Sequence, residues 1–327
     1  MPGWLLFLSG VVALAGIYAV LTLALNLHFG YGGLINFGIV AFFAIGGYTY
    51  TILTMPPPGL GEAYRFGFGF PWWLAFPAAG TVAAVFALVI GLPTLRVRGE
   101  YLLIVTFAFA EVVRSSLTNE AWLTNGARGF YSVVQPFRDL MDGQTYQVFL
   151  AVLILAVLAI CYLVARFVGT APFGRTLRAV RENEDVALSV SKDVYSFRLR
   201  AFVLGSIIAG LAGAMYVWYM TIAVPAIFAA EVTFAVWIAL VIGGTGSNRG
   251  AILGAFVLLG AQQAVKFIQA PAEMAAVISS IQLMLEGLLL VVILRFRPMG
   301  LLPEQSPPPP RERKQPEAER LQKAEGI

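Results

Sequence analysis

Charged residues are scarce in this chain of 327 residues: they make up 12% of it, against about a quarter in an ordinary soluble domain. The first 61 positions contain no Asp, Glu, Lys or Arg. Hydrophobic residues make up 59% and the mean hydropathy is +0.79. Several apolar runs are long enough to cross the roughly 30 Å of a bilayer core. The composition therefore excludes a soluble globular domain and predicts an all-α, polytopic transmembrane helical bundle.

Residues that carry catalysis or bind cofactors are equally scarce. Cys161 is the single cysteine, so no disulfide can form within the chain. His28 is the single histidine, and its position beside glycines at the end of an apolar run predicts an interfacial residue. The sequence contains no GxxxxGK[ST] or HExxH motif and no Cys/His cluster with metal-ligand spacing. We therefore expect no enzyme activity, no cofactor and no metal.

About nine apolar segments, within a range of eight to ten, are candidate membrane spans. Glycines interrupt the second and the seventh, so we expect either of these to be broken or re-entrant. The nine candidates are Trp4–Leu27, Gly33–Met55, Phe70–Leu95, Tyr101–Leu117, Tyr146–Val168, Ala201–Ala223, Val232–Gly246, Ala251–Ile268 and Met274–Phe296.

Basic residues beside these spans predict their orientation. Clusters at Arg96 and Arg98, at Arg175–Arg200, and at Arg295 and Arg297 account for the net charge of +4 without any role in nucleic-acid binding. Such clusters favour the cytoplasmic side. Even numbers of spans, two and then four, separate them, so one side can hold all three. This places the C-terminus inside and the N-terminus outside.

The domain organisation that follows is simple. Residues 1–302 form the transmembrane domain, interrupted by a charged loop at 169–200. Residues 303–327 are rich in proline and charge, which predicts a disordered cytoplasmic tail.

The charged loop is the most polar segment between two spans. Pro172 suits the start of a helix, and Phe173–Ser189 reads as one amphipathic helix with apolar positions at Leu177, Val180, Val186 and Leu188. A second short element is expected at Lys192–Arg200. Two interpretations compete: a helix on an anionic lipid surface, or a helix that inserts into a groove of a soluble partner. Mixed charge favours the second.

Small and ionisable residues inside the spans are candidates for lining a path. The glycines of AIGGY and IGGTGSNRG suggest close helix approach or a broken helix, whereas AGLAGA at 209–214 favours plain packing. Glu111 and Arg114 lie three residues apart and should neutralise each other, and Glu286 lies within the last span. The candidate path residues are Asn36, Gly46, Gly47, Glu111, Gly243, Gly244 and Glu286.

Six segments, in order, resemble the permeases of branched-chain amino acid ABC transporters, the LivM type especially. They are GLINFGIVAFFAIGGY, LRVRGEYLLIVTFAFAEVV, TNGARGF, APFGRTLRAVRENEDVALSV with RAFVLGSIIAGLAGAMY, VIGGTGSNRGAILGA and RPMGLL. Three positions depart from the family pattern: Asn36 replaces a usual serine, Ile39 a frequent histidine, and Ser191 a usual glycine.

The resemblance implies a permease subunit of a bacterial inner-membrane importer of branched-chain amino acids. Its partners would be a second permease, two cytoplasmic ATPases and a periplasmic or lipid-anchored binding protein. Gly174–Asp193 would be the loop that the ATPases contact. The residues expected to couple ATP hydrolysis to transport are Gly174, Arg175, Arg178, Arg181, Glu182, Asn183, Glu184 and Asp185.

Three alternatives remain open at this stage. Permeases for urea or short amides look very similar. An ion-coupled secondary amino-acid transporter could use Glu111 or Glu286, and a scaffold without transport activity is the third.

Overall fold

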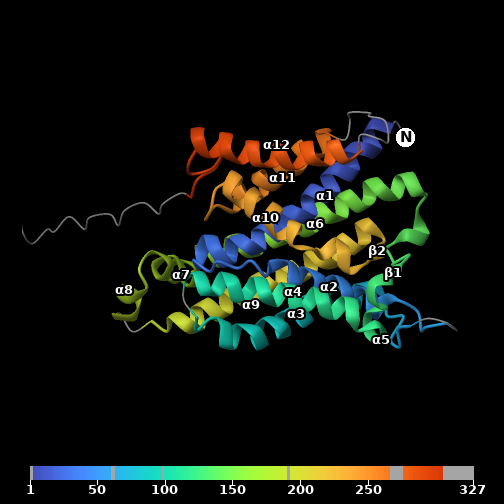
Figure 1. Cartoon of the computed structure of the whole chain (residues 1–327), viewed down its shortest axis with the longest axis horizontal. Helices are drawn as coiled ribbons and strands as arrows, with labels where there is room; N and C mark the ends of the chain where they lie inside the picture. The colour runs from blue at the N-terminus through green and yellow to red at the C-terminus, as the bar shows by residue number, and fades with distance from the viewer. Residues whose placement is uncertain (1–2, 60–62, 98, 190–191, 266–274, 305–327) are drawn as a thin grey trace, which may run out of the picture.

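Nine helices of 14 residues or more account for most of the part of the chain that the structure describes. The structure is a computed structural model that describes residues 3–59, 63–97, 99–189, 192–265 and 275–304. The nine lie roughly along one axis of the molecule (Figure 1). They are α1 (Gly3–Leu25), α2 (Ile39–Thr54), α3 (Trp72–Thr94), α4 (Glu100–Asn119), α6 (Gly143–Thr170), α9 (Val194–Met220), α10 (Ala230–Gly243), α11 (Asn248–Val265) and α12 (Ala275–Phe296).

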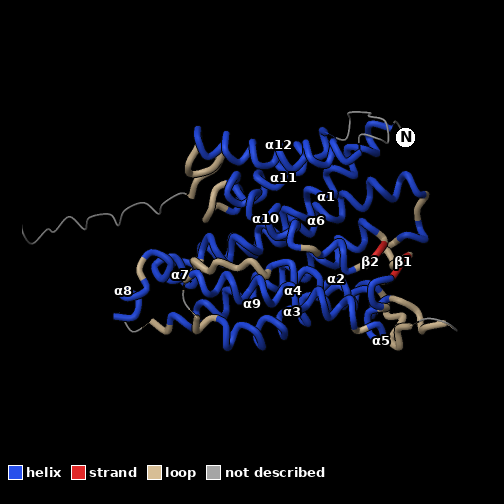
Figure 2. The backbone as a smooth tube through the Cα atoms, in the orientation of Figure 1, coloured by secondary structure: helices blue, strands red, loops and turns tan. Residues whose placement is uncertain are grey.

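Short elements gather at the two ends of this bundle (Figure 2). At one end lie α7 (Pro172–Glu182) and α8 (Glu184–Ser189); we call this the α7 end. At the other lie α5 (Ala121–Thr124) and the two-residue strands β1 (Phe130–Tyr131) and β2 (Ile222–Ala223), which pair antiparallel. The remaining turns are η1 (Asn26–Tyr31), a π-helix, and the 3-10 helices η2 (Gly126–Arg128), η3 (Arg138–Leu140) and η4 (Pro225–Phe228).

The predicted helical membrane bundle is confirmed. Within the described residues, six segments are long and apolar enough to cross a membrane: Gly3–Tyr31, Trp72–Thr94, Glu100–Asn119, Gly143–Thr170, Val194–Met220 and Pro225–Gly243. The other three predicted spans are also helices, and α2, with 16 residues, is the shortest of these.

Neither span that glycine interrupts is broken inside its helix: α2 and α10 are continuous. Each instead borders a non-helical segment, 32–38 and 244–247, and we call these the first and the second break. After η1, residues 32–38 have no helical structure, and α2 begins only at Ile39. Likewise α10 ends at Gly243, and Gly244 has a φ of +116°, which residues other than glycine rarely adopt. The two breaks expose backbone groups that must find partners inside the protein.

Helix α9 lies at the centre of the bundle and packs against α1, α2 and α3. Glycine makes its contact with α2 possible: a Cβ on Gly46 would collide with the carbonyl of Gly210, and one on Gly213 with the carbonyl of Phe43. The packing role predicted for the AGLAGA segment is therefore confirmed.

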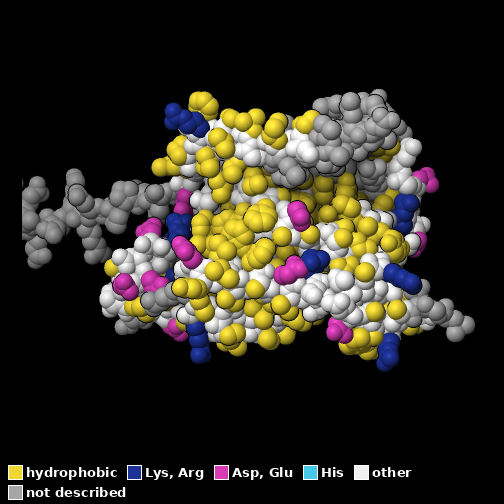
Figure 3. All heavy atoms as spheres, in the orientation of Figure 1, with side chains coloured by type: hydrophobic (Ala, Val, Ile, Leu, Met, Phe, Trp, Pro, Cys, Tyr) yellow, Lys and Arg dark blue, Asp and Glu magenta, His cyan; other side chains and the backbone are white. Residues whose placement is uncertain are grey.

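The outer surface is largely hydrophobic. Large apolar side chains of α3, α4 and α6 are exposed, among them Val89, Ile104 and Phe167. In the space-filling view, hydrophobic side chains cover most of the face between the two ends, and a few acidic and basic ones interrupt them (Figure 3). A surface of this kind suits lipid rather than water, so the chain is a multi-pass membrane protein.

The basic clusters meet at the α7 end. The guanidinium of Arg96 lies 5.9 Å from the ring centre of Tyr195 at the start of α9. Arg178 and Arg181 contact Glu304, shortly after Arg297. The even number of spans predicted between the clusters is consistent with this arrangement. Arg98 lies outside the described residues.

We predict that Gly213→Ala destabilises the bundle by about 1–3 kcal/mol, because the added methyl group must push α9 away from α2. Thermal unfolding of the purified protein in detergent measures this. Gly260→Ala in α11 is the matched control, since its Cβ would meet no described atom within 4 Å. Equal melting temperatures for the two variants would contradict the packing argument.

Candidate functional site

The candidate site begins with α7, which turns directly back from α6. Ala171 is extended and Pro172 takes the first helical position, where its missing N–H is not needed. A Cβ on Gly174 would collide with the carbonyls of Val168 and Gly169 at the end of α6. Glycine at this position thus lets α7 lie tightly against α6, which fixes the direction of the whole loop.

The loop contains two helices rather than the single one expected over Phe173–Ser189. Asn183 interrupts it with extended backbone, and its Oδ1 accepts a hydrogen bond from Val186 N at 3.1 Å, which caps α8. The short element expected over Lys192–Arg200 is also wrong, because α9 already begins at Val194. Both errors have one cause: side-chain caps end and start helices where apolar periodicity continues.

Asp193 caps the start of α9. Its carboxylate accepts hydrogen bonds from the hydroxyl and the backbone N–H of Ser196. These bonds hold the pKa of Asp193 below its usual range. Ser191, one of the departures from the family pattern, lies outside the described residues.

Two of the predicted coupling arginines point into the bundle and share one carboxylate. Arg178 Nη1 lies 3.3 Å from Glu304 Oε1, and Arg181 Nη2 lies 2.8 Å from Glu304 Oε2. The three side chains are only 19–26% exposed, so solvent screens these ion pairs less than surface pairs. We call this arrangement the Glu304 clasp. Glu304, which the sequence assigns to the disordered tail, is thus part of the bundle.

The clasp also reaches the first break. Arg178 donates to Gly169 O at 2.6 Å and lies over the ring of Tyr31. Arg181 donates to the carbonyl of Gly30 in η1. Each arginine therefore satisfies a backbone carbonyl as well as a carboxylate.

The segment before Glu304 closes the second break. Leu301 N and Leu302 N each donate, at 2.9 Å, to the carbonyls of Ile242 and Gly243 at the end of α10. These two of the last helical carbonyls would otherwise lack partners. Gly244 must be glycine for this contact, because its Cβ would lie 2.6 Å from Leu302 O.

Of the remaining coupling candidates, one is paired and four are exposed. Glu184 Oε2 lies 3.0 Å from Arg198 Nη1, which ties α8 to α9. The side chains of Arg175, Glu182, Asn183 and Asp185 face outward. Two apolar side chains of α8 accompany them: Val186 is 59% and Leu188 46% exposed. Leu177 and Val180, by contrast, are buried. The loop thus exposes both polar and apolar side chains, while its buried side chains and the Glu304 clasp fix it to the bundle.

Asn36 lies in a buried polar network rather than on an open path. Its Nδ2 donates to His28 Nδ1 at 3.0 Å, its Oδ1 accepts from Gly38 N at 2.7 Å, and Trp237 donates to its carbonyl. His28 Nε2 then donates to Phe202 O at 2.8 Å. This assignment of the tautomer uses both ring nitrogens of a neutral imidazole.

The interfacial position expected for His28 is wrong, since its side chain is completely buried. A Cβ on Gly205 would collide with the imidazole, so a glycine on α9 makes room for it. Ile39, another departure from the family pattern, is also buried, and its side chain has no polar atom to join this network.

The glycine candidates lie at helix contacts. Gly46 and Gly47 face α9, and Gly243 faces Gly250 of α11 across the second break. Glu111 forms the expected ion pair with Arg114, with Nε 2.9 Å from Oε2, on an exposed face of α4. Glu286 belongs to α12, and its side chain lies outside the described part of the structure. The structure therefore does not bring the path candidates together.

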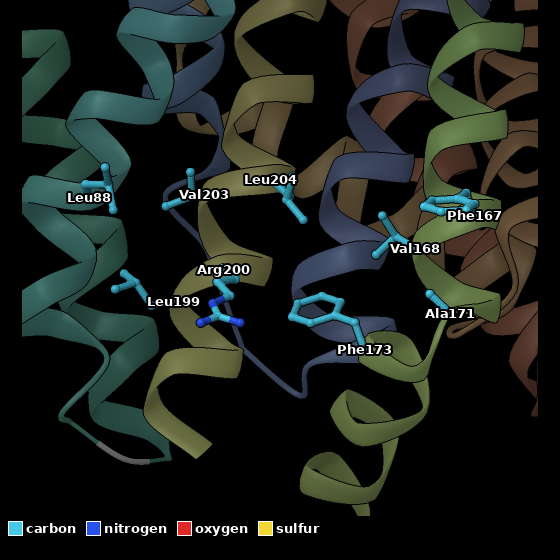
Figure 4. A pocket seen from close by; sticks show the side chains of 9 residues that line it. All are labelled: Leu88, Phe167, Val168, Ala171, Phe173, Leu199, Arg200, Val203 and Leu204. Carbon is cyan, nitrogen blue, oxygen red and sulfur yellow. The ribbon is translucent and has the colours of Figure 1, made fainter. Parts of the chain in front are cut away.

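An apolar groove of about 470 Å³ lies beside α7. Its walls come from α3, α6 and α9, and the ring of Phe173 in α7 extends toward α9, where Arg200 lies (Figure 4). Such a groove suits a hydrocarbon chain and holds no pair of groups for chemistry. Within the described ranges, no three His, Cys, Asp or Glu side chains are grouped to hold a metal.

Comparison with known proteins decides the family. Residues 7–294 match the family described as the permease component of the branched-chain amino acid transport system. The chain belongs to this family. It is therefore a non-catalytic membrane subunit, and membership implies ATPases and a binding protein as partners.

Curated relatives agree with this family. The chain is 29% identical over 320 residues to the high-affinity branched-chain amino acid transport system permease protein LivM of Escherichia coli strain K12, an alignment that covers 91% of this chain and 70% of the relative. It is 27% identical over 327 residues to the probable branched-chain amino acid transport permease protein LivM of Methanocaldococcus jannaschii, covering 91% and 94% of the two chains. No solved structure matches.

The sequence interpretation missed the residues that hold the breaks together. Asn26 Nδ2 donates to Asn248 Oδ1 at 2.9 Å, and Asn26 Oδ1 accepts from Gly246 N at 2.9 Å. A signal existed: both asparagines lie in apolar surroundings next to glycine-rich breaks. No such signal marks Glu304, because its place in a proline-rich, charged segment suggests disorder.

We predict that Glu304→Gln lowers the free energy of unfolding by about 1–3 kcal/mol, because two half-buried guanidinium groups lose their counter-charge. Thermal unfolding in detergent checks this. Glu100→Gln is the control: Glu100 lies exposed at the same end and makes no ion pair with a described residue. A loss no greater than that of the control would contradict the clasp.

Proposed function

We propose that this chain is the permease subunit of an inner-membrane ABC importer of branched-chain amino acids. A second, related permease completes the path, two ATPases bind on the cytoplasmic side, and a periplasmic or lipid-anchored protein delivers the substrate. The α7 end, with the C-terminus, is the cytoplasmic one. Family membership and the basic residues gathered at the α7 end support this proposal.

The observation that carries the coupling role is an exposed surface on an internally fixed helix. Arg175, Glu182 and Asp185 of α7 and α8 face outward, beside Val186 and Leu188. A short amphipathic helix of this kind fits a groove on a soluble partner. The mixed charge of the surface argues against attachment to anionic lipid, which selects basic helices.

The base of α7 connects this surface to the membrane bundle. Gly174 holds α7 against α6, and the Glu304 clasp joins it to η1 and to the segment that closes α10. The Glu184–Arg198 pair joins α8 to α9. A push on α8 therefore acts on several membrane helices at once, as alternating access driven by ATPases requires.

An ion-coupled transporter is the weaker alternative. Such transporters hold acidic groups inside the bundle. Glu111 is instead paired with Arg114, whose positive charge opposes the binding of a coupling cation. The urea or amide alternative differs only in the substrate, and competition for uptake decides it: an excess of leucine, isoleucine or valine should suppress labelled leucine uptake by the complete importer, and urea should not.

We predict that Val186→Asp combined with Leu188→Asp abolishes co-purification of the ATPases and reduces leucine uptake at least about tenfold, because both substitutions place charge in the apolar part of the docking surface. These variants leave the Glu304 clasp and the Glu184–Arg198 pair intact, so the subunit should still insert into the membrane.

Leu140→Asp is the matched control, since Leu140 is 76% exposed on η3, away from α7 and α8. Its ATPases should co-purify as in the unaltered importer. Retention of the ATPases by the double variant would exclude α8 as the docking element.

A further inference from the structure

The Glu111–Arg114 pair lies in an unfavourable place for lipid contact. Glu111 is in the middle of α4, a candidate membrane span. Its side chain is 53% exposed and that of Arg114 39%. Charged groups at this depth are costly against hydrocarbon, even when paired, and usually face a bundle interior or a polar cavity. This face of α4 therefore meets a polar path or another subunit rather than lipid.

A buried hydroxyl without a partner lies beside the pair. Thr233 in α10 is completely buried, and its Oγ1 has no hydrogen-bond partner in the described structure. Every other buried threonine there donates its hydroxyl to a backbone carbonyl; these are Thr22, Thr51, Thr54, Thr94, Thr106 and Thr124. Thr233 departs from this pattern, and a buried group left unpaired in a native protein calls for a ligand or a function.

Thr233, Glu111 and Arg114 line the same small hollow. Aromatic rings form much of the rest of its wall: Phe37 before α2, Phe107 on α4 and Phe228 on η4. Polar and aromatic groups of this kind, side by side, suit a small molecule with a charged part and an apolar part. The hollow has a volume of only about 10 Å³. This space holds about one water molecule, so a larger ligand would lie across its mouth.

The first turn of α10 adds further charge at this place. Helix α10 has 14 residues and begins at Ala230, which also lines the hollow. The free N–H groups of such a terminus favour an anion. Glu231 in the same turn is exposed and lies within electrostatic range of Arg114. Groups that prefer an anion and groups that prefer a cation therefore stand next to each other.

We propose that Glu111, Arg114 and Thr233 form a station on the transport path that binds a zwitterionic α-amino acid with an apolar side chain. Arg114 and the first turn of α10 receive the carboxylate at the mouth of the hollow, and one water inside the hollow links it to the Thr233 hydroxyl. Glu111 and Glu231 receive the ammonium group, and the aromatic rings receive the apolar side chain. A neutral amide such as urea has neither the carboxylate nor the ammonium group that these charges would bind. The inference rests on the proposed function and assigns its substrate contacts.

The test uses the complete importer in proteoliposomes, with its ATPases, second permease and binding protein. Thr233→Val keeps the shape and removes the hydroxyl, and Arg114→Gln removes the positive charge. We expect each to reduce the maximal rate of leucine uptake about tenfold, while leucine-loaded binding protein still stimulates ATP hydrolysis within about twofold of the unaltered importer. Thr81→Val is the matched control, because its hydroxyl is exposed on α3 and bonds to its own helix.

A charge exchange separates binding from structure. The double variant Glu111→Arg and Arg114→Glu keeps an ion pair but reverses its direction. A merely structural pair tolerates this exchange, so normal leucine uptake in that variant would overturn the proposal. Loss of uptake with normal assembly and normal stimulation of ATP hydrolysis supports it.

Chemical labelling provides a second measurement. Because Cys161 is the single cysteine, Thr233→Cys in a Cys161→Ala background carries one thiol. Because Thr233 is buried in this structure, we expect a small methanethiosulfonate reagent to label the thiol only while the importer hydrolyses ATP and its path opens. Leucine should slow this labelling, whereas urea should not. Absence of protection by leucine would also overturn the proposal. If the unaltered importer transports no amino acid, the proposed function itself is wrong. Failure of the proposed function can therefore be told apart from failure of the proposed binding station.

Discussion

Backbone groups that leave a helix inside a membrane must find hydrogen-bond partners within the protein, and this requirement organises the α7 end. Two helices stop short, at Asn26–Tyr31 and at Gly243. Their free carbonyls and amides receive partners from distant parts of the chain: the side chain of Asn26, that of Arg181 and the backbone of Leu301 and Leu302. Gly30, Ile242, Gly243 and Gly246 are buried, and buried backbone groups rarely stay without partners. The contacts are therefore a condition for having these breaks at all.

One set of contacts thereby serves two purposes. Arg178 and Arg181 satisfy the carbonyls of Gly169 and Gly30 and at the same time hold the surface that we propose for the ATPases. The broken segments and the docking surface are thus mechanically continuous. Rearrangement at one break changes the position of α7, and movement of α7 changes the breaks.

The sequence predicts the helical bundle because length and hydropathy are local signals. It predicts the Glu111–Arg114 pair for the same reason, since three residues on a helix determine the distance. The direction in which Arg178 and Arg181 point depends on Glu304, more than 120 residues away in the chain. No periodicity within the loop contains that information. The amphipathic pattern does not show the division of the loop at Asn183, because a polar cap also fits the polar face of such a pattern.

The buried histidine shows a similar limit. Composition suggests that a lone His beside glycines lies at the interface, yet Gly205 on α9 and Asn36 after the break make a closed polar site for it. Such a site exists only after the helices have assembled.

The position of the closing segment in the chain has a consequence for synthesis. Residues 301–304 complete both the end of α10 and the pairing of two arginines made much earlier. During translation, Arg178 and Arg181 emerge long before their shared carboxylate exists. The membrane helices therefore enter the bilayer while the α7 end is still open, and a subunit whose synthesis stops early leaves two unmatched positive charges where a finished one has a fixed surface.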